Sequence, residues 1–244
     1  MKIDSLALQM RPRAPHESAD LGIRLCQVKH GDVYRCYLVV AIPVALLCLS
    51  LFEISPWLPT FVMWWLKPWL DRTVLFVLAR AAFGQKTSPG DLWREQRDVW
   101  WRRLFSTLTL RRLSPWRSFT APVYQLEGHG LFRLRKRVLQ LRRRHTGAAF
   151  MMTSAFSMAE TGLTFAIISL VFWFGTPGQG FDFDSFFKGD SHVVAQWLAS
   201  LAYILAVLFL EPFYVAAGFG MYLNRRAELE AWDIEQEFRR AFAS

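Results

Sequence analysis

Four long apolar runs constrain the fold of this 244-residue chain more than any other feature. They extend over residues 36–54, 57–83, 148–174 and 193–222. A helix needs about 20 predominantly apolar residues to cross the hydrocarbon core of a bilayer. Within that core, only helices and closed barrels pair all of their backbone polar groups. The sequence therefore predicts an all-α integral membrane protein with about four transmembrane helices and additional cytoplasmic interfacial amphipathic helices.

The composition also favours a membrane over an aqueous setting. Hydrophobic residues make up 53% of the chain and charged residues only 20%, which is too apolar for an ordinary soluble domain of this length. The formal net charge of +9 suits either nucleic acid or an anionic membrane surface. No nucleic-acid recognition module accompanies the arginines. We therefore expect the partner to be the lipid bilayer, with its anionic inner-leaflet lipids, and expect no nucleic acid.

The distribution of charge between the runs predicts the topology. Residues 1–33 contain no apolar core of signal-peptide length, so we expect a cytoplasmic N-terminal segment. Residues 85–147 form a strongly basic insert, and basic loops lie on the cytoplasmic side. Residues 175–192 carry more acidic than basic side chains and are expected outside. The four-span membrane domain, residues 34–222, then leaves residues 223–244 as a cytoplasmic amphipathic helix, with both termini inside the cell.

Two amphipathic helices are predicted within the basic insert. The first begins near Asp91 after a Ser-Pro-Gly helix-start pattern and carries tryptophans and leucines on one face. The second begins at Leu131, with apolar residues at spacings of three and four among arginines. We favour a collar that lies flat on the inner leaflet; the alternatives are a docking face for another envelope protein and specific lipid-headgroup binding. The residues expected to contact headgroups are Arg102, Arg103, Arg135, Lys136, Arg137, Arg142, Arg143 and Arg144.

Charged residues interrupt the predicted second and third spans. Counted at about 1.5 Å per residue, Lys67, Asp71 and Arg72 fall near the middle of the bilayer, and Glu160 reaches a similar depth. An unpaired ionisable side chain at mid-membrane costs about 3 kcal/mol, so pairing or access to water is required. Lys67 and Asp71 are four residues apart and share one helix face. We predict a balanced network of these four charges that holds the second and third spans in register.

Two further charges form a secondary candidate pair. Glu211 in the fourth run and Arg80 in the second run are expected at a comparable height. Pro68 follows Lys67, Pro212 follows Glu211, and helix interruptions beside intramembrane charges are common in transporters. This pattern supports an alternative to the structural network, in which the charges form a pathway for an ion or a proton.

Motifs of soluble enzymes are not found in the sequence. The five histidines lack the spacing of a helical metal site, and no serine lies in a nucleophile-elbow context. The three cysteines, Cys26, Cys36 and Cys48, also lack metal-ligand spacing, so we expect neither a cofactor nor a metal. The predicted function is a non-enzymatic accessory or scaffold in a cell-envelope process. The alternative is a small transporter or ion-coupled membrane component.

The C-terminal stretch EPFYVAAGFGMYLNRRAELEAWDIEQEFRR resembles a known group of proteins. It is similar to the closing segment of the glycerophosphodiester phosphodiesterase membrane-domain and YciC-like superfamily of bacterial multi-pass membrane proteins. Residues 84–101, GQKTSPGDLWREQRDVWW, resemble a segment that follows an early span in that group. The residues that match the closing segment are Pro212, Tyr222, Arg225, Arg226, Glu230, Asp233 and Glu235.

The resemblance implies a bacterial inner-membrane protein. Members of the superfamily commonly carry more spans, and residues 104–110 are too short and too closely flanked by arginines to supply another. Where the membrane domain is fused to a phosphodiesterase, the hydrolase contributes its own histidine and carboxylate metal site. No residues here match that site, so the resemblance does not extend to the phosphodiesterase activity.

Overall fold

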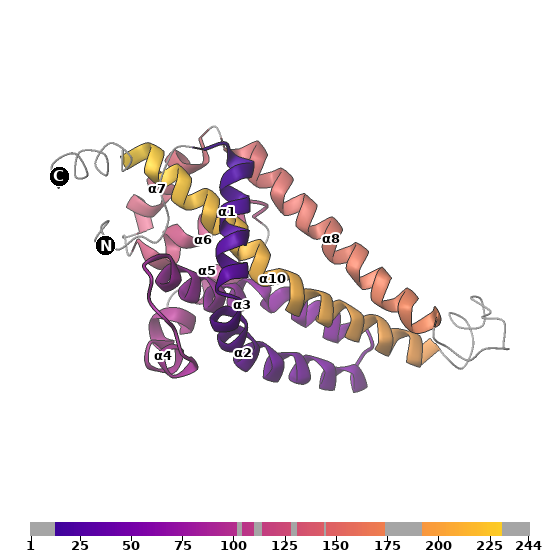
Figure 1. The fold of residues 1–244 in the computed structure, drawn as a ribbon. Coiled ribbons are helices and arrows are strands. Elements are labelled where there is room, and N and C mark those ends of the chain that lie inside the picture. The colour runs from indigo at the N-terminus through magenta and orange to yellow at the C-terminus, as the bar shows by residue number, and fades with distance from the viewer. Residues whose placement is uncertain are drawn as a thin grey trace.

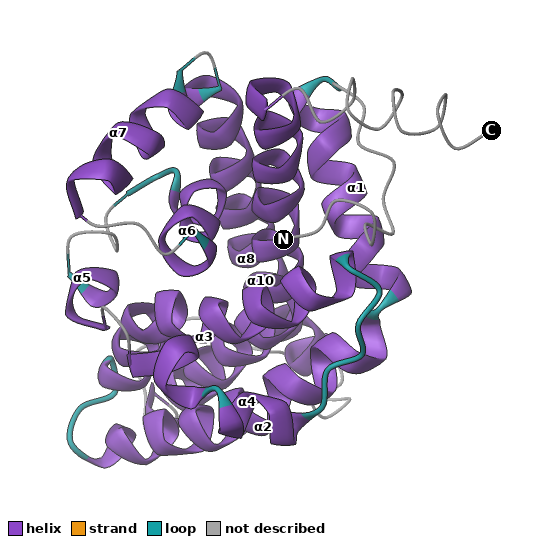
Figure 2. Cartoon of the chain, turned by 90° about the vertical axis from the view of Figure 1, so that its left-hand side faces the viewer, coloured by secondary structure: helices purple, strands orange, loops and turns teal. Residues whose placement is uncertain are grey.

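The described part of this computed structural model is built of helices (Figure 1). Figure 2 shows them joined by short loops, without a strand among the described residues, which confirms the all-α prediction there. The described residues are 13–101, 104–109, 114–127, 131–143, 145–173 and 192–230. The elements are α1 (Pro15–Val28), α2 (His30–Ser50), the 3-10 turn η2 (Leu51–Glu53), α3 (Leu58–Ala82), α4 (Pro89–Arg94), the π-helical turn η3 (Arg97–Trp101), α5 (Leu104–Leu108), α6 (Arg117–Leu126), α7 (Leu131–Arg142), α8 (Thr146–Trp173) and α10 (His192–Glu230).

Three helical stretches are long and apolar enough to cross a membrane. They are His30–Glu53, Thr146–Leu170 and Val193–Leu229, and they coincide with the first, third and fourth predicted spans. The second predicted span, residues 57–83, forms α3. This helix carries four charged side chains and is not among the three stretches that are apolar enough to cross a membrane. The helices therefore indicate a membrane protein, while a fourth crossing stays a prediction.

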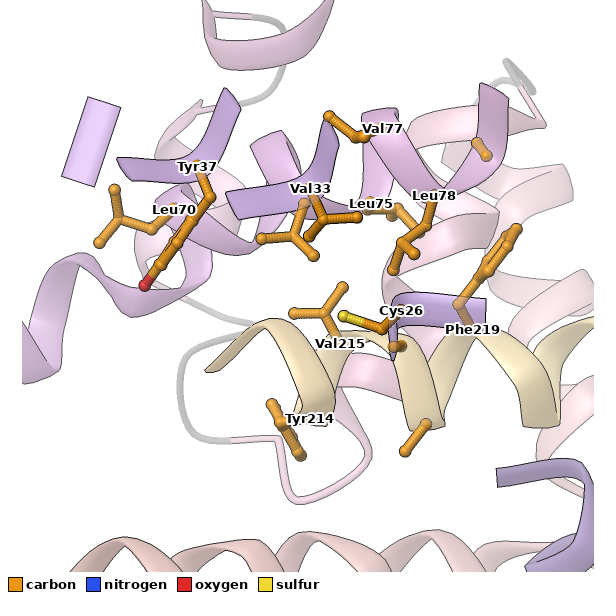
Figure 3. Close-up of a cluster of buried hydrophobic side chains, with 14 of the residues drawn as sticks. Cys26, Val33, Tyr37, Leu70, Leu75, Val77, Leu78, Tyr214, Val215 and Phe219 are labelled. Carbon is orange, nitrogen blue, oxygen red and sulfur yellow. The ribbon is translucent and has the colours of Figure 1, made fainter. Parts of the chain in front are cut away.

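The α3 helix lies at the centre of the fold. Fifteen of its 25 residues are buried, and it packs against α2, α6 and α10. Apart from its four charged positions, α3 is apolar on all sides, and such a helix is typically enclosed by protein. Figure 3 shows the apolar core that α3 forms with α1, α2 and α10. Side chains in this core include Cys26, Val33, Tyr37, Leu70, Leu75, Leu78, Val215 and Phe219.

The α10 helix is longer than the predicted fourth span. Its 39 residues extend over roughly 58 Å, about twice the thickness of a hydrocarbon core. The sequence predicts an end at Tyr222 and a separate helix over residues 223–244, whereas α10 continues to Glu230. The reason is that neither glycine nor proline occurs between Tyr222 and Glu230 to end the helix. Residues 231–244 and nearly all of the predicted outer loop, residues 175–192, lie outside the described residues.

The α1 helix packs directly against α10, so the predicted cytoplasmic N-terminal segment contributes to the folded core. A Cβ atom added to Gly22 would lie 1.9 Å from the carbonyl oxygen of Ala216, and one added to Gly220 would lie 2.2 Å from that of Ser18. The two backbones can therefore approach this closely only because both positions are glycine. Ser18 and Gly22 on one helix, and Ala216 and Gly220 on the other, show the four-residue spacing of small residues that is common in closely packed membrane helices.

The basic insert packs onto the bundle through α6 and α7. A Cβ atom on Gly218 of α10 would lie 2.5 Å from the backbone carbon of Ser118, so α6 also approaches α10 closely. The apolar stripe of α7, Leu134, Val138 and Leu141, is buried by protein. The prediction that this stripe faces the lipid leaflet is wrong, because α6 and α10 already cover it.

Candidate functional site

Lys67 of α3 lies between two carboxylates from other helices. Its Nζ atom is 2.5 Å from Oε2 of Glu160 in α8 and 2.8 Å from Oε2 of Glu211 in α10. The exposed fraction of the side chain is 8% for Lys67 and 2% for Glu211. One ammonium group therefore connects α3, α8 and α10 inside the molecule.

Arg117, the first residue of α6, supplies the second cation. Its Nη2 donates a hydrogen bond to Oε1 of Glu211 at 2.6 Å, and its Nε lies 3.1 Å from Oδ2 of Asp71. The guanidinium carbon is 5.2 Å from the centre of the Tyr214 ring, which is within cation–π range. The Arg117 side chain is only 9% exposed. Because Ser118 packs on Gly218, two helical turns beyond Glu211, the close approach of α6 to α10 carries this guanidinium inward.

Glu211 joins the two halves of the cluster, because one of its oxygens contacts Lys67 and the other accepts from Arg117. We call the five connected side chains the ionic cluster. They come from four helices, α3, α6, α8 and α10. The members of the ionic cluster are Lys67, Asp71, Arg117, Glu160 and Glu211.

The ionic cluster contains three carboxylates and two cations. If every member is ionised, its net charge is −1. Both carboxylate oxygens of Asp71 are buried and accept no hydrogen bond from the described residues, so the contact with Arg117 is purely ionic. A buried carboxylate that lacks donors is unfavourable unless it gains a proton or a counter-cation. The arrangement can therefore take up one positive charge.

A cavity of about 310 Å³ opens beside the ionic cluster. Four cluster members line it, and Asp71 is not part of its wall. Three aromatic rings and several hydroxyl groups complete the wall. The lining residues are Lys67, Arg117, Glu160 and Glu211 of the cluster together with Trp64, Phe156, Tyr214, Ser114, Thr153, Ser157, Pro115 and Leu210.

The predicted network agrees with the structure in part. Lys67 and Glu160 are brought together as predicted, and Asp71 lies in the same cluster, where it contacts Arg117. Arg72 does not join them, because its Nη2 donates to the backbone oxygen of Asp98 at 3.2 Å. Successive residues are rotated by about 100° around a helix, so Arg72 leaves α3 in a different direction from Asp71.

The predicted Arg80–Glu211 pair is not formed. Arg80 Nη1 lies 3.5 Å from Oε1 of Glu95, outside the ionic cluster, and Glu211 contacts Lys67 and Arg117 instead. Depth along a helix was the only basis for this pairing, and depth does not specify the direction in which each side chain points. Glu211 is therefore central to the candidate site, whereas Arg80 is not part of it.

Sequence reasoning missed Arg117. It lies in the basic insert, where its neighbours in the chain include many other arginines. Nothing in the local sequence distinguishes it from a headgroup-facing arginine. Only the close approach of α6 to α10, which depends on Gly218, brings its guanidinium to the carboxylates.

The predicted headgroup-contacting residues fall into three groups. Arg135, Lys136 and Arg143 are exposed and remain candidates for this contact. Two others are engaged by the protein. Arg137 Nε lies 3.2 Å from Oε2 of Glu127, and the guanidinium carbon of Arg142 lies 3.6 Å from the centre of the Trp116 ring. The third group lies outside the described residues and consists of Arg102, Arg103 and Arg144.

Among the residues that the structure describes, no group of three or more His, Cys, Asp and Glu side chains could hold a metal ion. Comparisons of the chain with protein-family models, curated proteins and solved structures find no match. The ionic cluster and its cavity are therefore the features from which a function can be inferred.

Proposed function

We propose that this chain is an ion-coupled membrane component that holds one proton in its ionic cluster. The observation that carries the proposal is the imbalance of three carboxylates, of which Glu160 is 16% exposed, against two buried cations beside a cavity. An uncompensated charge at this depth of a membrane costs about 3 kcal/mol, and one proton removes the imbalance. Because the cavity borders the cluster, a change in the charge of the cluster also changes what the cavity can bind.

The proton is shared by groups from every helix around Asp71. Asp71 and Glu211 compete for Arg117, and Glu160 and Glu211 compete for Lys67, so protonation of any one carboxyl group changes how both cations are held. Coupled carboxylates of this kind titrate as a unit. The titratable and charged groups that face Asp71 are Tyr37 of α2, Lys67 of α3, Arg117 of α6 and Glu211 of α10, and Arg117 in turn faces Glu160 of α8 and Tyr214 of α10.

We also propose the membrane setting. In it α2, α3, α8 and the first part of α10 cross a bacterial inner membrane, with both termini in the cytosol. The basic insert supports this orientation, and so does the C-terminal resemblance to bacterial multi-pass proteins. The charges of α3 suit a crossing helix because they point into the protein, where they are paired.

A non-enzymatic accessory or scaffold is the second candidate function. The observation that favours it is the exposed basic surface formed by Arg135, Lys136 and Arg143, which suits anionic inner-leaflet lipids or another envelope protein. This role requires no proton in the ionic cluster. Neither proposal involves nucleic acid, a cofactor or an enzymatic reaction.

A differential acid–base titration separates the two functions. The Asp71→Asn variant leaves two carboxylates and two cations, so it needs no proton to be neutral. The purified wild-type protein should bind about one more proton near neutral pH than this variant does. Glu53→Gln is the matched control, because it removes an exposed carboxylate at the end of η2, outside the ionic cluster. Identical titration curves for wild type and Asp71→Asn would contradict the proton proposal and favour the scaffold function.

A further inference from the structure

We propose that the cavity beside the ionic cluster binds a small organic monocation in exchange for the proton. This inference rests on the proposed function, because it needs a cluster that holds one exchangeable positive charge. The cavity lies between α3, α8 and α10 and is reached by Glu160 and Glu211. Both the charge of the cluster and the chemistry of the wall favour a cation of this class.

The charge of the cluster excludes an anion and disfavours a neutral molecule. With the proton removed, the five members carry a net charge of −1. An anion would double that excess, and a neutral molecule would leave it uncompensated. Lys67 and Arg117 line the cavity, but each is already held by two carboxylates and neither is available to bind a second anion. A single positive charge restores neutrality.

The wall of the cavity suits an organic cation better than a metal ion. Trp64, Phe156 and Tyr214 present aromatic surface, and the rings of Phe156 and Tyr214 meet edge-on with centres 5.6 Å apart. Aromatic faces attract ammonium groups and are used to recognise quaternary ammonium ligands. Hard metal cations instead require a shell of six or more oxygen ligands, and the described residues do not supply one.

The volume of the cavity sets the size of the ligand. About 310 Å³ is the lower end of the range for small-molecule pockets. A compact amine or quaternary ammonium compound fits this space. Glu160 is the most exposed member of the cluster, at 16%, and lies where an entering cation would first meet a carboxylate.

Choline and its neutral carbon isostere, dimethylbutanol, test the inference, because they share a shape and differ in charge. Isothermal titration calorimetry of the full-length protein in two buffers with different ionisation enthalpies measures both binding and proton release. We expect choline to bind at least about tenfold more tightly than dimethylbutanol and to release about one proton. Its apparent affinity should rise about tenfold per pH unit while the cluster remains protonated.

Two variants locate the site. Asp71→Asn removes the excess negative charge and should weaken choline binding at least about tenfold and abolish proton release, whereas Glu53→Gln should behave as wild type. Equal binding of the two isosteres, or unchanged choline binding by Asp71→Asn, would overturn the inference. If choline fails to bind but the titration difference between wild type and Asp71→Asn is present, the inference of an organic monocation fails and the proton proposal stands. Binding without proton release would contradict both.

Discussion

The Nζ atom of Lys67 in α3 lies 2.5 Å from Oε2 of Glu160 in α8, and this ion pair connects the two helices beside the cavity. The α8 helix otherwise packs mainly against α10, and no residue in its most apolar stretch is buried. Nearer the start of α8, Thr153 donates a hydrogen bond to the backbone oxygen of Pro115 at 2.7 Å. The Lys67–Glu160 contact, which depends on charge, therefore forms part of the wall of the cavity.

The balance of charge in the ionic cluster predicts an unequal response to mutation. Lys67→Met leaves three carboxylates with one cation and should destabilise the protein by about 3–5 kcal/mol. Glu160→Gln leaves two of each, with Lys67 still held by Glu211, and should cost about 1 kcal/mol or less. The double variant should be more stable than Lys67→Met alone. Thermal unfolding in detergent measures all three, and losses that simply add would show that Lys67 and Glu160 are not coupled.

The close packing of α1 on α10 predicts sensitivity at two glycines. Gly22→Ala and Gly220→Ala each place a methyl group within 2.2 Å of a backbone oxygen, so each should lower the free energy of unfolding by about 1–3 kcal/mol or more. Gly162→Ala is the matched control, because an added Cβ there meets nothing within 4 Å. Helix propensity makes the control neutral or stabilising by up to about 1 kcal/mol. Equal stability of all three variants would contradict this packing.

His145 predicts a pH dependence at the end of the bundle where α8 begins. Its Nε2 lies 3.4 Å from Oε2 of Glu228 in α10. Burial lowers the pKa of His145, and this effect together with Arg225 outweighs the opposite effect of Glu228. Since the pKa is lower in the folded state than the unfolded value of 6.5, stability is greatest above 6.5 and falls as the pH drops towards the folded-state pKa.

The measurement is the unfolding temperature at neutral pH and at about pH 5.5, compared between wild type and His145→Gln. The variant should lose less stability on acidification than the wild type does. The same loss in both proteins would assign the acid sensitivity to other groups.

The proposed topology predicts which surface positions face each side of the membrane. In a variant without cysteines, Glu53→Cys should react with a membrane-impermeant maleimide added to intact cells, because η2 joins the first two proposed spans on the outer side. Lys136→Cys, on the exposed face of α7, should react only after the cells are permeabilised. Labelling of Lys136→Cys in intact cells would reverse the orientation.

Local patterns in the sequence were enough to predict the long helices, whereas the amphipathic helix predicted to begin near Asp91 ends at Arg94 and is followed by the separate elements η3 and α5. The apolar runs correspond to α2, α3, α8 and α10, and the helix-start pattern at Ser88 forms a capping box, with its backbone N–H 2.9 Å from Oδ2 of Asp91. These features depend on residues that lie within a few positions of one another. The continuation of α10 beyond Tyr222 was missed because charged residues mark a membrane boundary without ending a helix.

The candidate site could be predicted only in part, because its remaining contacts depend on tertiary packing. Depth along the helices was enough to place Lys67 and Glu160 in one layer, but not to specify which charges pair within it. The position of Arg117 depends on Gly218, which lies about a hundred residues away in the chain and acts only by permitting close helix packing. Neither the periodicity nor the composition of the sequence indicates this contact between α6 and α10.

Infrared difference spectroscopy of the carboxyl groups tests the central claim most directly. The C=O stretch of a protonated carboxylic acid is distinct from the bands of an ionised carboxylate, so it reports whether the ionic cluster holds a proton. We predict a protonated buried carboxyl band in the wild-type protein at neutral pH, its loss in Asp71→Asn, and its retention in Glu53→Gln. A wild-type spectrum without this band, or a band of undiminished intensity in Asp71→Asn, would contradict the account.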